Sequence, residues 1–339
     1  MNRTYLVTGG LGFIASHFIK LLLKKEPESF VINIDKETYA GNPKNLDGIS
    51  EENCLTIEAD ILDAALIRSV LEVHRPDYVI HFAAETHVDN SITDPLGFVK
   101  TNVLGTATLL NESLAYYKAR PDCFRGFIHI STDEVYGALT PQDSHVFDEQ
   151  TRYDPHSPYS ASKAGSDHLV QSYHDTYGLP TIITHSSNNY GSHQHPEKLI
   201  PKVINNLYNG KMIPVYGDGR QMRDWIHVEN NCETIYNIML NGSIGETYCI
   251  GGECDIENIQ IINKICDIFD DRYTGTHHAD LIDFVPDRLG HDFRYAIDIS
   301  KIKREILCAP LKSLDKGLIE TVEWYCENQD WVKEMKERK

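Results

Sequence analysis

Residues 4–15 of the chain read TYLVTGGLGFIA. The apolar run at 5–8 predicts a short buried strand, and the apolar positions at 18–23 predict a helix after the glycine-rich turn. Gly9 permits the tight turn, and Gly12 lets the backbone come close to a pyrophosphate. A helix N-terminus offers free N–H groups and positive potential to such an anion. The stretch therefore predicts a dinucleotide-binding turn between the first strand and the first helix.

Strands alternate with helices outward from this turn. Further strands are predicted at residues 30–34, 54–57, 78–82, 126–130 and 181–184, with helices around 64–73 and 103–117 and after residue 158. This alternation predicts a parallel sheet with helices on both faces. Because crossovers between parallel strands are right-handed, we expect a doubly wound α/β fold of the Rossmann type.

The pattern changes near residue 188, where prolines, glycines and short segments become frequent. We therefore expect a dinucleotide-binding Rossmann domain over residues 1–187 and a smaller C-terminal substrate-binding domain over residues 188–339. Helices are predicted in the second domain near 199–207, 258–269 and 314–325. Some of the later segments are expected to return to the large sheet.

The nature of the dinucleotide follows from Asp35, which ends the second predicted strand 23 residues after Gly12. A carboxylate at this place accepts hydrogen bonds from both ribose hydroxyls and repels a 2′-phosphate, which favours NAD over NADP. The neighbouring Lys36 is an opposite signal, because a cation tolerates a phosphate. Residues after the third and fourth strands are further candidates to border the adenine, the ribose and the phosphates: Asp60, Ile61, Ala83 and Ala84.

A tyrosine and a lysine four residues apart, Tyr159 and Lys163, form the only Tyr-x-x-x-Lys pair in the chain. Pro158 directly before Tyr159 is typical of a helix start, so the two side chains share one helix face. The positive charge of Lys163 favours the tyrosinate, and we expect it to lower the pKa of Tyr159 from about 10. A phenol with a lowered pKa takes a proton from an alcohol near neutral pH, which indicates alcohol oxidation.

Thr132, Asp133 and Glu134 follow the predicted strand at 126–130. Ligands bind at the carboxyl ends of strands in open α/β sheets, so we expect this triplet in the site. Adjacent side chains of an extended chain point in opposite directions, and the backbone must therefore turn at Asp133 for both carboxylates to reach one ligand. With an extra acid and an extra base, the set predicts oxidation coupled to elimination, with Asp133 protonated and Glu134 ionised. Paired carboxylates also suit a glycosidase, but a glycosidase leaves the dinucleotide turn unexplained.

Composition excludes several classes of protein. The chain has 339 residues and a net charge of −18, which opposes binding to nucleic acid. No apolar run approaches the roughly 20 residues of a membrane helix, and eight scattered cysteines without a Cys-x-x-Cys pair argue against a disulfide framework. We expect a soluble cytoplasmic protein without a signal peptide. His193, His195, His277 and His278 lack a cysteine or carboxylate at metal-ligand spacing, so no metal is expected.

The chain resembles the extended short-chain dehydrogenase/reductase superfamily, also called the NAD-dependent epimerase/dehydratase family, and within it the dTDP-glucose 4,6-dehydratase family. The resemblance spans residues 4–332 and is carried by residues 33–42, 81–89, 131–137, 157–163, 187–191, 196–201, 223–225 and 287–292. Its most specific part is the triplet at 132–134, since sugar epimerases of the superfamily usually carry a Ser or Thr here without the acidic pair. Ala15 stands where a glycine is common, and plant-type UDP-glucose dehydratases also tend to have Gly-Phe-Ile-Ala-Ser here, so thymine and uracil both stay open as the nucleobase.

The resemblance implies two sets of binding residues. The NAD set is Gly9, Gly12, Phe13, Ile14, Asp35, Lys36, Thr38, Asp60, Ile61, Phe82, Ala83, Ala84, Thr101, Tyr159, Lys163 and Asn189. The substrate set is Thr86, Thr132, Asn188, Lys198, Leu199, Pro214, Tyr216, Arg223, Asn258, Arg288 and His291. In the second set, Arg223 and Arg288 suit a diphosphate through bidentate contacts, and Lys198 adds a point charge.

The implied reaction is a lyase reaction in which dTDP-glucose becomes dTDP-4-keto-6-deoxyglucose and water. Tyr159 takes the C4 hydroxyl proton while hydride passes from C4 to NAD, with Lys163 on the nicotinamide ribose and Thr132 orienting the sugar. Glu134 then removes the C5 proton, and Asp133 protonates the C6 hydroxyl as it leaves. Hydride returns to C6 and Glu134 returns a proton to C5.

Three alternative functions stay open, and a second copy of the chain is expected as a partner. A UDP-glucose 4,6-dehydratase uses the same residues, and a sugar-nucleotide 4-epimerase uses the same tyrosine and NAD without elimination. A dinucleotide-sensing binding protein needs none of the catalytic set. The resemblance also implies a homodimer through the helix that carries Tyr159 and the helix at 103–117.

Overall fold

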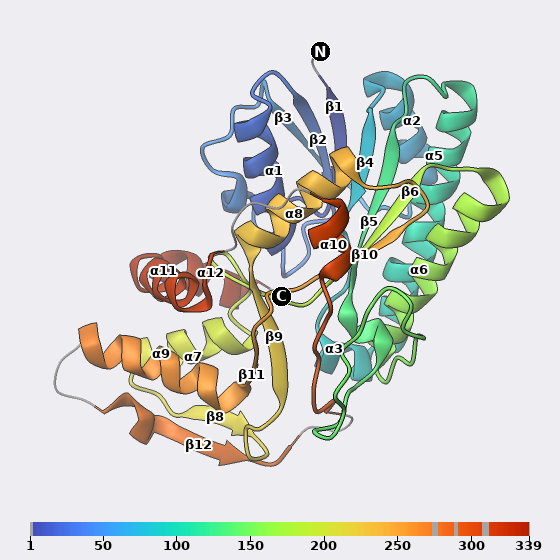
Figure 1. Ribbon diagram of the computed structural model, residues 1–339. Helices are drawn as coiled ribbons and strands as arrows, with labels where there is room; N and C mark the ends of the chain where they lie inside the picture. Colours follow the sequence, from blue (N-terminus) through green and yellow to red (C-terminus); the bar gives the residue numbers. More distant parts are fainter. Residues whose placement is uncertain (1–2, 273–276, 288–290, 307–311, 339) are drawn as a thin grey trace.

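The computed structural model describes residues 3–272, 277–287, 291–306 and 312–338. A seven-stranded parallel sheet forms its centre, with the strand order β10-β6-β5-β4-β1-β2-β3 (Figure 1). The chain runs outward through β1, β2 and β3 and then returns to β4 beside β1, which creates the reversal point at which doubly wound folds bind ligands. The strands are β1 (Thr4–Thr8), β2 (Phe30–Asp35), β3 (Cys54–Glu58), β4 (Tyr78–His81), β5 (Gly126–Thr132), β6 (Thr181–Ser186) and β10 (Thr247–Ile250).

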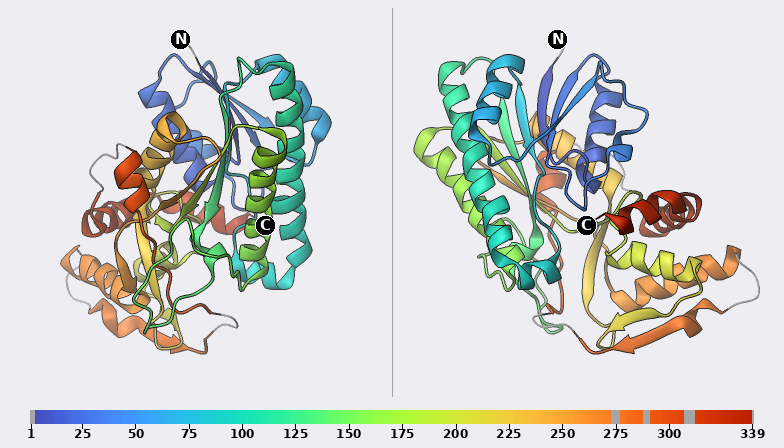
Figure 2. Two further views of the ribbon diagram at one scale, coloured as in Figure 1. Left: turned by 45° about the vertical axis from the view of Figure 1, so that its right-hand side comes forward. Right: turned by 180° about the vertical axis from the view of Figure 1, so that it is seen from behind.

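Helices cover both faces of this sheet (Figure 2). One face carries α1 (Phe13–Lys25), α8 (Val228–Asn241) and α10 (Ser300–Glu305), and the other carries α2 (Ala64–His74), α5 (Thr106–Ala119) and α6 (Pro158–Tyr177). Tyr5 and Val7 belong to the core on the first face, whereas Leu6 belongs to the core on the second. This alternation is what a strand buried on both sides requires.

A second part of the molecule has a core of its own, and Figure 1 shows it below the sheet. It contains a three-stranded sheet of β7 (Asn188–Tyr190), β9 (Met222–His227) and β11 (Asp255–Glu257), and a pair of β8 (Ile213–Tyr216) and β12 (Ile282–Val285). Its helices are α7 (Leu199–Tyr208), α9 (Asn258–Arg272), α11 (Leu314–Glu327) and α12 (Gln329–Glu337).

Short elements connect these parts. They are η1 (Pro43–Leu46), α3 (Val88–Thr93), α4 (Pro95–Phe98), η2 (Val99–Gly105), η3 (Asp133–Tyr136) and η4 (His278–Leu281). The helix predicted at 103–117 is α5, which begins at Thr106 and follows the π-helical segment η2. The predicted doubly wound sheet is confirmed, and β10 is a later segment that returns to it. The domain boundary at residue 187 stays a prediction.

Local signals explain where α6, the helix with Tyr159 and Lys163, begins and ends. Ser157 caps its first turn in a capping box with Ser160, and Pro158 occupies the first helical position. Gly178 ends the helix in the left-handed conformation with φ 68°. These caps place Tyr159 in the first turn, close to the end of β5.

Candidate active site

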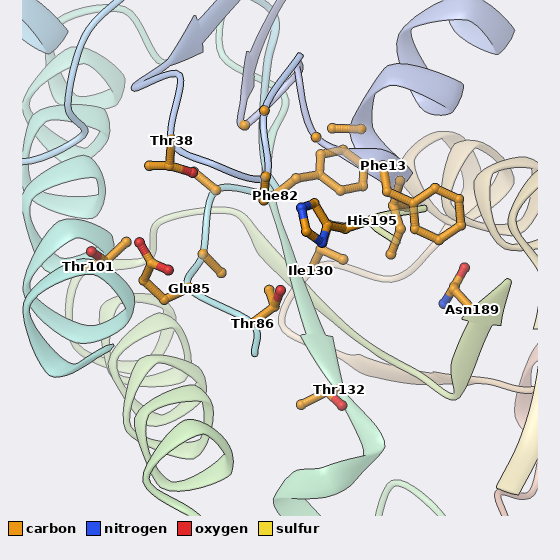
Figure 3. A pocket seen from close by; sticks show the side chains of 18 of the residues that line it. Phe13, Thr38, Phe82, Glu85, Thr86, Thr101, Ile130, Thr132, Asn189 and His195 are labelled. Carbon is orange, nitrogen blue, oxygen red and sulfur yellow. The ribbon is translucent and has the colours of Figure 1, made fainter. Parts of the chain in front are cut away.

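A pocket lies at the carboxyl ends of β1, β2, β4 and β5, between the large sheet and the second part of the molecule (Figure 3). The glycine turn after β1, the first turns of α6 and the segment at 186–198 contribute to its walls. Every residue predicted to act in catalysis and every residue predicted to bind the dinucleotide lines this pocket. The structure thus brings these residues together, while their individual roles stay predictions.

The glycine turn packs closely against the loop after β4, and Gly9 has no space for a side chain. Gly9 has φ +75°, and a Cβ on it would lie 2.8 Å from the backbone of Ala83. Gly12 caps α1 without a side-chain hydrogen bond, so no side chain occupies the free N–H groups of the first turn. An uncapped helix N-terminus beside a close backbone approach fits a pyrophosphate group.

Asp35 is buried at the end of β2, and its carboxylate accepts hydrogen bonds from the backbone on both sides of the strand end, at Leu11 and at Glu37. Its Oδ2 accepts the backbone N–H of Leu11 at 2.9 Å, and its Oδ1 accepts that of Glu37 at 2.7 Å. Burial raises the pKa of Asp35, and these two hydrogen bonds oppose the rise. Each carboxylate oxygen keeps a second lone pair, so the group can still accept ribose hydroxyls. Lys36 points its charge at Asp60, with Nζ 3.1 Å from the carboxylate.

The backbone turns directly after β5, as the triplet at 132–134 requires. β5 ends at Thr132, and the 3₁₀ turn η3 begins at Asp133. The Thr132 hydroxyl caps the turn by accepting the N–H of Glu134 at 3.3 Å. Both carboxylates consequently line the same pocket, although they are adjacent in sequence.

Asp133 has the environment of a proton donor. It is 1% exposed, and its Oδ2 has no hydrogen-bond partner. Burial raises the pKa of Asp133 well above its usual range, and the charges of Glu134 and Asp224 raise it further. Both effects favour the protonated form of Asp133, which is the direction expected from the sequence, and its role as an acid stays a prediction.

Tyr159 and Lys163 do not form the expected pair. Lys163 Nζ donates to the carbonyl oxygen of Ile130 at 2.8 Å. Burial raises the pKa of Tyr159, the charge of Glu134 raises it further, and a hydrogen bond with Thr132 opposes the rise. The prediction that Lys163 lowers the pKa of Tyr159 is wrong for this structure, because burial and the neighbouring carboxylates outweigh the lysine. The same interactions show that the phenol and the two acids lie close together.

Comparison with known proteins gives the family. The family model described as GDP-mannose 4,6 dehydratase matches residues 6–321. The chain is 47% identical to dTDP-glucose 4,6-dehydratase of Salmonella typhimurium, over 98% of this chain and 95% of that protein. The chain belongs to the dTDP-glucose 4,6-dehydratase family.

Two solved structures share the fold with this member of the dTDP-glucose 4,6-dehydratase family. A dTDP-glucose 4,6-dehydratase from Streptomyces venezuelae with NAD and TYD bound has a TM-score of 0.89 and 41% identity, covering 98% of this chain and 99% of that one. The dTDP-glucose 4,6-dehydratase of Bacillus anthracis in complex with NAD has a TM-score of 0.88 and 38% identity, with the same coverage.

The substrate residues expected for the family divide into two groups. Thr86, Thr132, Asn188 and Lys198 line the pocket. Lys198 Nζ donates to the carbonyl oxygen of Thr86 at 3.1 Å, and the buried Oδ1 of Asn188 has no hydrogen-bond partner. An unpartnered buried acceptor and an ammonium group in the wall of one pocket suit a polar ligand.

The other expected substrate residues lie outside this pocket: Leu199, Pro214, Tyr216, Arg223, Asn258 and His291. Arg223 is buried on β9 and donates to the carbonyl oxygens of Met222, Asp292 and Phe293. The rings of Tyr216 and His291 lie 6.3 Å apart. Arg288 falls outside the described residues. The roles of these residues in binding stay predictions.

Sequence reasoning missed several residues of the pocket wall: Ala15, Ile34, Ala40, Gly41, Ala59, Glu85, Ile130, Ser131, Ser186, Ser187, Gln194, His195 and Glu197. Ser186 and Ser187 follow β6, and the rule that ligands bind at the carboxyl ends of strands could have found them. His195 was considered only as a metal ligand. No simple pattern marks Glu85, whose loop after β4 is held by Asn102, the side-chain oxygen of which accepts the N–H of Glu85 at 2.9 Å.

The described part of the chain contains neither a metal-binding cluster nor a membrane-spanning helix. Within residues 3–272, 277–287, 291–306 and 312–338, no group of three or more His, Cys, Asp or Glu side chains could hold a metal ion. None of the described helices has both the length and the apolar character needed to cross a membrane.

Proposed function

We propose that this protein is an NAD-dependent nucleotide-sugar 4,6-dehydratase, a lyase that converts dTDP-glucose to dTDP-4-keto-6-deoxyglucose and water. The observation that carries the proposal is that Tyr159, Glu134 and the buried Asp133, whose pKa is raised well above its usual range, line one pocket together with a dinucleotide turn. The names of the family relatives support the same activity. The solved structures of two relatives with NAD bound support the same cofactor.

The residues present fit NAD. The backbone at Gly9 and Gly12 would hold the pyrophosphate at the uncapped N-terminus of α1, and Asp35 would accept the ribose hydroxyls. When bound, NAD accepts a hydride from C4 of the sugar and returns it to C6, so that it is regenerated within each turnover.

Tyr159 begins the reaction by removing the proton of the C4 hydroxyl. Its hydrogen bond with Thr132 favours the phenolate, against the effects of burial and of Glu134. Thr132 is at the end of β5, where a rigid strand also lets it orient the sugar near O4. Lys163 lines the same pocket, where its ammonium group would hold the ribose of the cofactor.

The two acids then carry out the elimination across C5 and C6. The C4 ketone makes the C5 proton acidic, and Glu134, which is partly exposed, removes it as a carboxylate. Asp133 is protonated, so it gives its proton to the C6 hydroxyl, which departs as water. Two adjacent residues can have opposite protonation states because only Asp133 is fully buried.

The final step restores both acids. Glu134 returns its proton to C5 as C6 is reduced. The proton that Tyr159 took from the C4 hydroxyl goes back to Asp133, which balances the water released. The C4 ketone remains in the product, since only one hydride is moved.

Two alternatives use most of the same residues. A UDP-glucose 4,6-dehydratase differs only in the nucleobase, and no described contact yet selects thymine over uracil. A sugar-nucleotide 4-epimerase needs Tyr159 and NAD but has no use for an acid and a base at C5 and C6. The burial and protonation of Asp133 favour the dehydratase.

The test is incubation of the purified protein with dTDP-glucose and with UDP-glucose separately, without added NAD. We expect the alkali-induced absorbance of a 4-keto sugar with dTDP-glucose, and water loss from C6 in the mass spectrum. Conversion of UDP-glucose alone would transfer the proposal to the UDP-glucose enzyme. An isomer of unchanged mass would indicate the epimerase, and no product from NAD-loaded protein would refute the lyase.

We also propose that the protein is a homodimer through α5, α6 and the adjoining η2. Leu96 and Leu104, on α4 and η2, are 77% and 54% exposed. On α6, Ala161 is exposed and Gly165 is half-buried, with a Cβ on Gly165 lying 3.4 Å from Val103 of η2. Exposed leucines next to a shallow helix face support a helix-to-helix contact between two copies.

Two further assignments belong with this proposal. We propose a division at residue 187 between an NAD-binding and a sugar-nucleotide-binding domain, supported by the separate core of α7, α9 and α11. We propose a cytoplasmic location, supported by the absence of a disulfide bond among the cysteines of the described part of the chain.

A further inference from the structure

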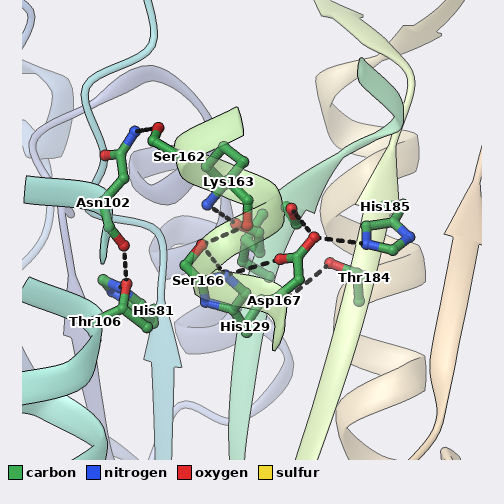
Figure 4. A network of polar contacts seen from close by, with 12 residues as sticks. His81, Asn102, Thr106, His129, Ser162, Lys163, Ser166, Asp167, Thr184 and His185 are labelled. Carbon is green, nitrogen blue, oxygen red and sulfur yellow. Dashed lines mark hydrogen bonds and ion pairs between the residues drawn. The ribbon is translucent and has the colours of Figure 1, made fainter. Parts of the chain in front are cut away.

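A buried polar network lies beneath Lys163 and centres on Asp167 (Figure 4). Asp167 is one turn after Lys163 on α6, is 1% exposed and does not line the pocket. Its Oδ2 accepts a hydrogen bond from the Ser131 hydroxyl at 2.9 Å and lies 3.0 Å from His185 Nε2. Its Oδ1 lies 3.2 Å from His129 Nε2. No step of the reaction uses Asp167 directly, so the network needs another explanation.

The hydrogen bonds of this network are consistent with a single negative charge, on Asp167. Burial lowers the pKa of His129 to about 4, so this imidazole is neutral at pH 7. A neutral His185 satisfies its partners, because Nε2–H donates to Asp167 while Nδ1 accepts the Tyr136 hydroxyl at 2.6 Å. Although burial raises the pKa of Asp167, the hydrogen bonds from His129 and His185 hold it well below its usual range.

Lys163 is buried, and a nearby negative charge helps to keep its side chain in the ammonium form. Its side chain is 4% exposed, and its Nζ donates to a backbone carbonyl rather than to a carboxylate. Burial lowers the pKa of Lys163 to about 8, and the charge of Asp167 opposes this lowering. The other titratable groups that face Lys163 are Tyr159 on the same helix, His81 on β4 and His129 on β5. A pKa near 8 leaves little margin, so the ammonium form at neutral pH depends on Asp167.

We propose that Asp167 is a positioning residue for the reaction: its carboxylate keeps Lys163 in the ammonium form and, through Ser131, holds the end of β5 in place. Ser131 lies between Ile130, whose carbonyl oxygen accepts from Lys163, and Thr132. Asp167 therefore acts on the catalytic residues both by its charge and by the geometry of β5. The inference rests on the proposed function, in which Lys163 must be positive.

Asp167→Asn tests the charge at constant size. His185 can change tautomer to accept from the new amide, so the fold should be kept. We expect the alkaline limb of the pH–rate profile to move toward acid by about one pH unit or more, with turnover near pH 7.5 reduced about threefold or more and largely recovered near pH 6. Asp167→Glu, which restores the charge, should return most of the activity.

Asp175→Asn is the matched control. Asp175 is exposed on the same helix, where it accepts a hydrogen bond from Gln171 at 2.9 Å. This variant makes the same change of charge without touching the network, so its pH–rate profile should match that of the unchanged protein. An equal loss of activity at every pH in Asp167→Asn would mean a merely structural role and would overturn the proposal.

A second readout does not depend on turnover. Lysines labelled with ¹³C at the ε-carbon are titrated by NMR, and Lys163→Met assigns the signal. We expect a midpoint near 8 in the unchanged protein and a value lower by about one unit or more in Asp167→Asn. An unchanged midpoint in this variant refutes the proposal. A Lys163 that is already neutral below pH 6 in the unchanged protein also refutes it, even if Asp167→Asn fails to fold.

The two readouts separate this inference from the proposed function. If the unchanged protein makes no keto sugar from dTDP-glucose but the Lys163 midpoint still depends on Asp167, the proposed reaction fails and the electrostatic coupling stands. If the keto sugar forms while the titration midpoint of Lys163 is the same with and without Asp167, the proposed reaction stands and the role of Asp167 is refuted.

Discussion

Asp133 and Glu134 are neighbours in the chain but differ in burial: Asp133 is 1% exposed, whereas Glu134 is only partly buried. The charge of Glu134 adds to burial in raising the pKa of Asp133. An ionised Glu134 therefore favours the protonated form of Asp133. This coupling gives one acid and one base from two adjacent carboxyl groups, which is what elimination across C5 and C6 requires.

Asp133→Asn should reduce turnover and increase stability. Asparagine cannot give a proton, so we expect kcat to fall about 10²- to 10⁴-fold. The unfolded chain loses the Asp133 proton above about pH 4, while the folded protein keeps it, so the unchanged protein loses stability as pH rises. Asparagine has no such dependence. The gain in Tm of the variant should thus grow as pH increases from about 4 until Asp133 ionises in the folded protein.

Thermal unfolding over this pH range measures the effect. Asp330→Asn is the control, because Asp330 is exposed on α12. A gain in Tm for Asp133→Asn that is the same at every pH would contradict the raised pKa.

Glu134→Gln should stop the reaction after the first step. Oxidation at C4 uses Tyr159 as its base and does not require Glu134, so reduced cofactor should accumulate on the protein with little dehydrated product. Glu134 also raises the pKa of Tyr159, so the pH dependence of C4 oxidation should shift toward acid in the variant. Stopped-flow absorbance of the reduced nicotinamide checks both points. Normal turnover would show that Glu134 is not the C5 base.

Tyr159→Phe should block C4 oxidation and leave substrate binding largely intact. Loss of the general base should lower kcat about 10²- to 10⁴-fold, with a much smaller change in Kd. Single-turnover kinetics and calorimetric binding of dTDP-glucose separate the two effects. Reduced cofactor forming at the normal rate would remove Tyr159 from the chemistry.

Asp35→Asn should weaken NAD binding and relax the choice between NAD and NADP. Asparagine offers one acceptor oxygen where the carboxylate offers two to Leu11 and Glu37. We expect an increase of about 10- to 100-fold in the Kd for NAD, measured by calorimetry on cofactor-free protein. Lys36→Gln is the comparison: it removes the cation that would accept a 2′-phosphate. NADP binding more weakly to Asp35→Asn than to the unchanged protein would be evidence against this role.

Leu104→Lys should convert the dimer to monomers, because a charge then occupies the proposed contact between two copies. Ile319→Lys is the matched control: Ile319 on α11 is 41% exposed, against 54% for Leu104. Sedimentation velocity should give a lower mass for the first variant only. Equal masses for both variants would place the interface elsewhere.

Much of the site could be predicted because its signals are local. Gly9 and Gly12 act through backbone freedom at their own positions. Tyr159 and Lys163 share a helix face because they are four residues apart, and caps at Ser157 and Gly178 define that helix. The pKa of Tyr159 could not be predicted in this way. Its direction depends on burial and on Glu134, which is 25 residues away in the chain.

The amino-acid sequence by itself determined the doubly wound sheet, the glycine turn after β1 and the candidate catalytic side chains that line the pocket, because periodicity, glycine positions and short spacings act over a few residues. Only the tertiary structure decided the electrostatics. It buried Asp133, directed Lys163 to the carbonyl oxygen of Ile130 and placed Asp167 against Ser131, 36 residues away in sequence. Charges interact through space and through burial, so their protonation states exist only once distant segments have packed together.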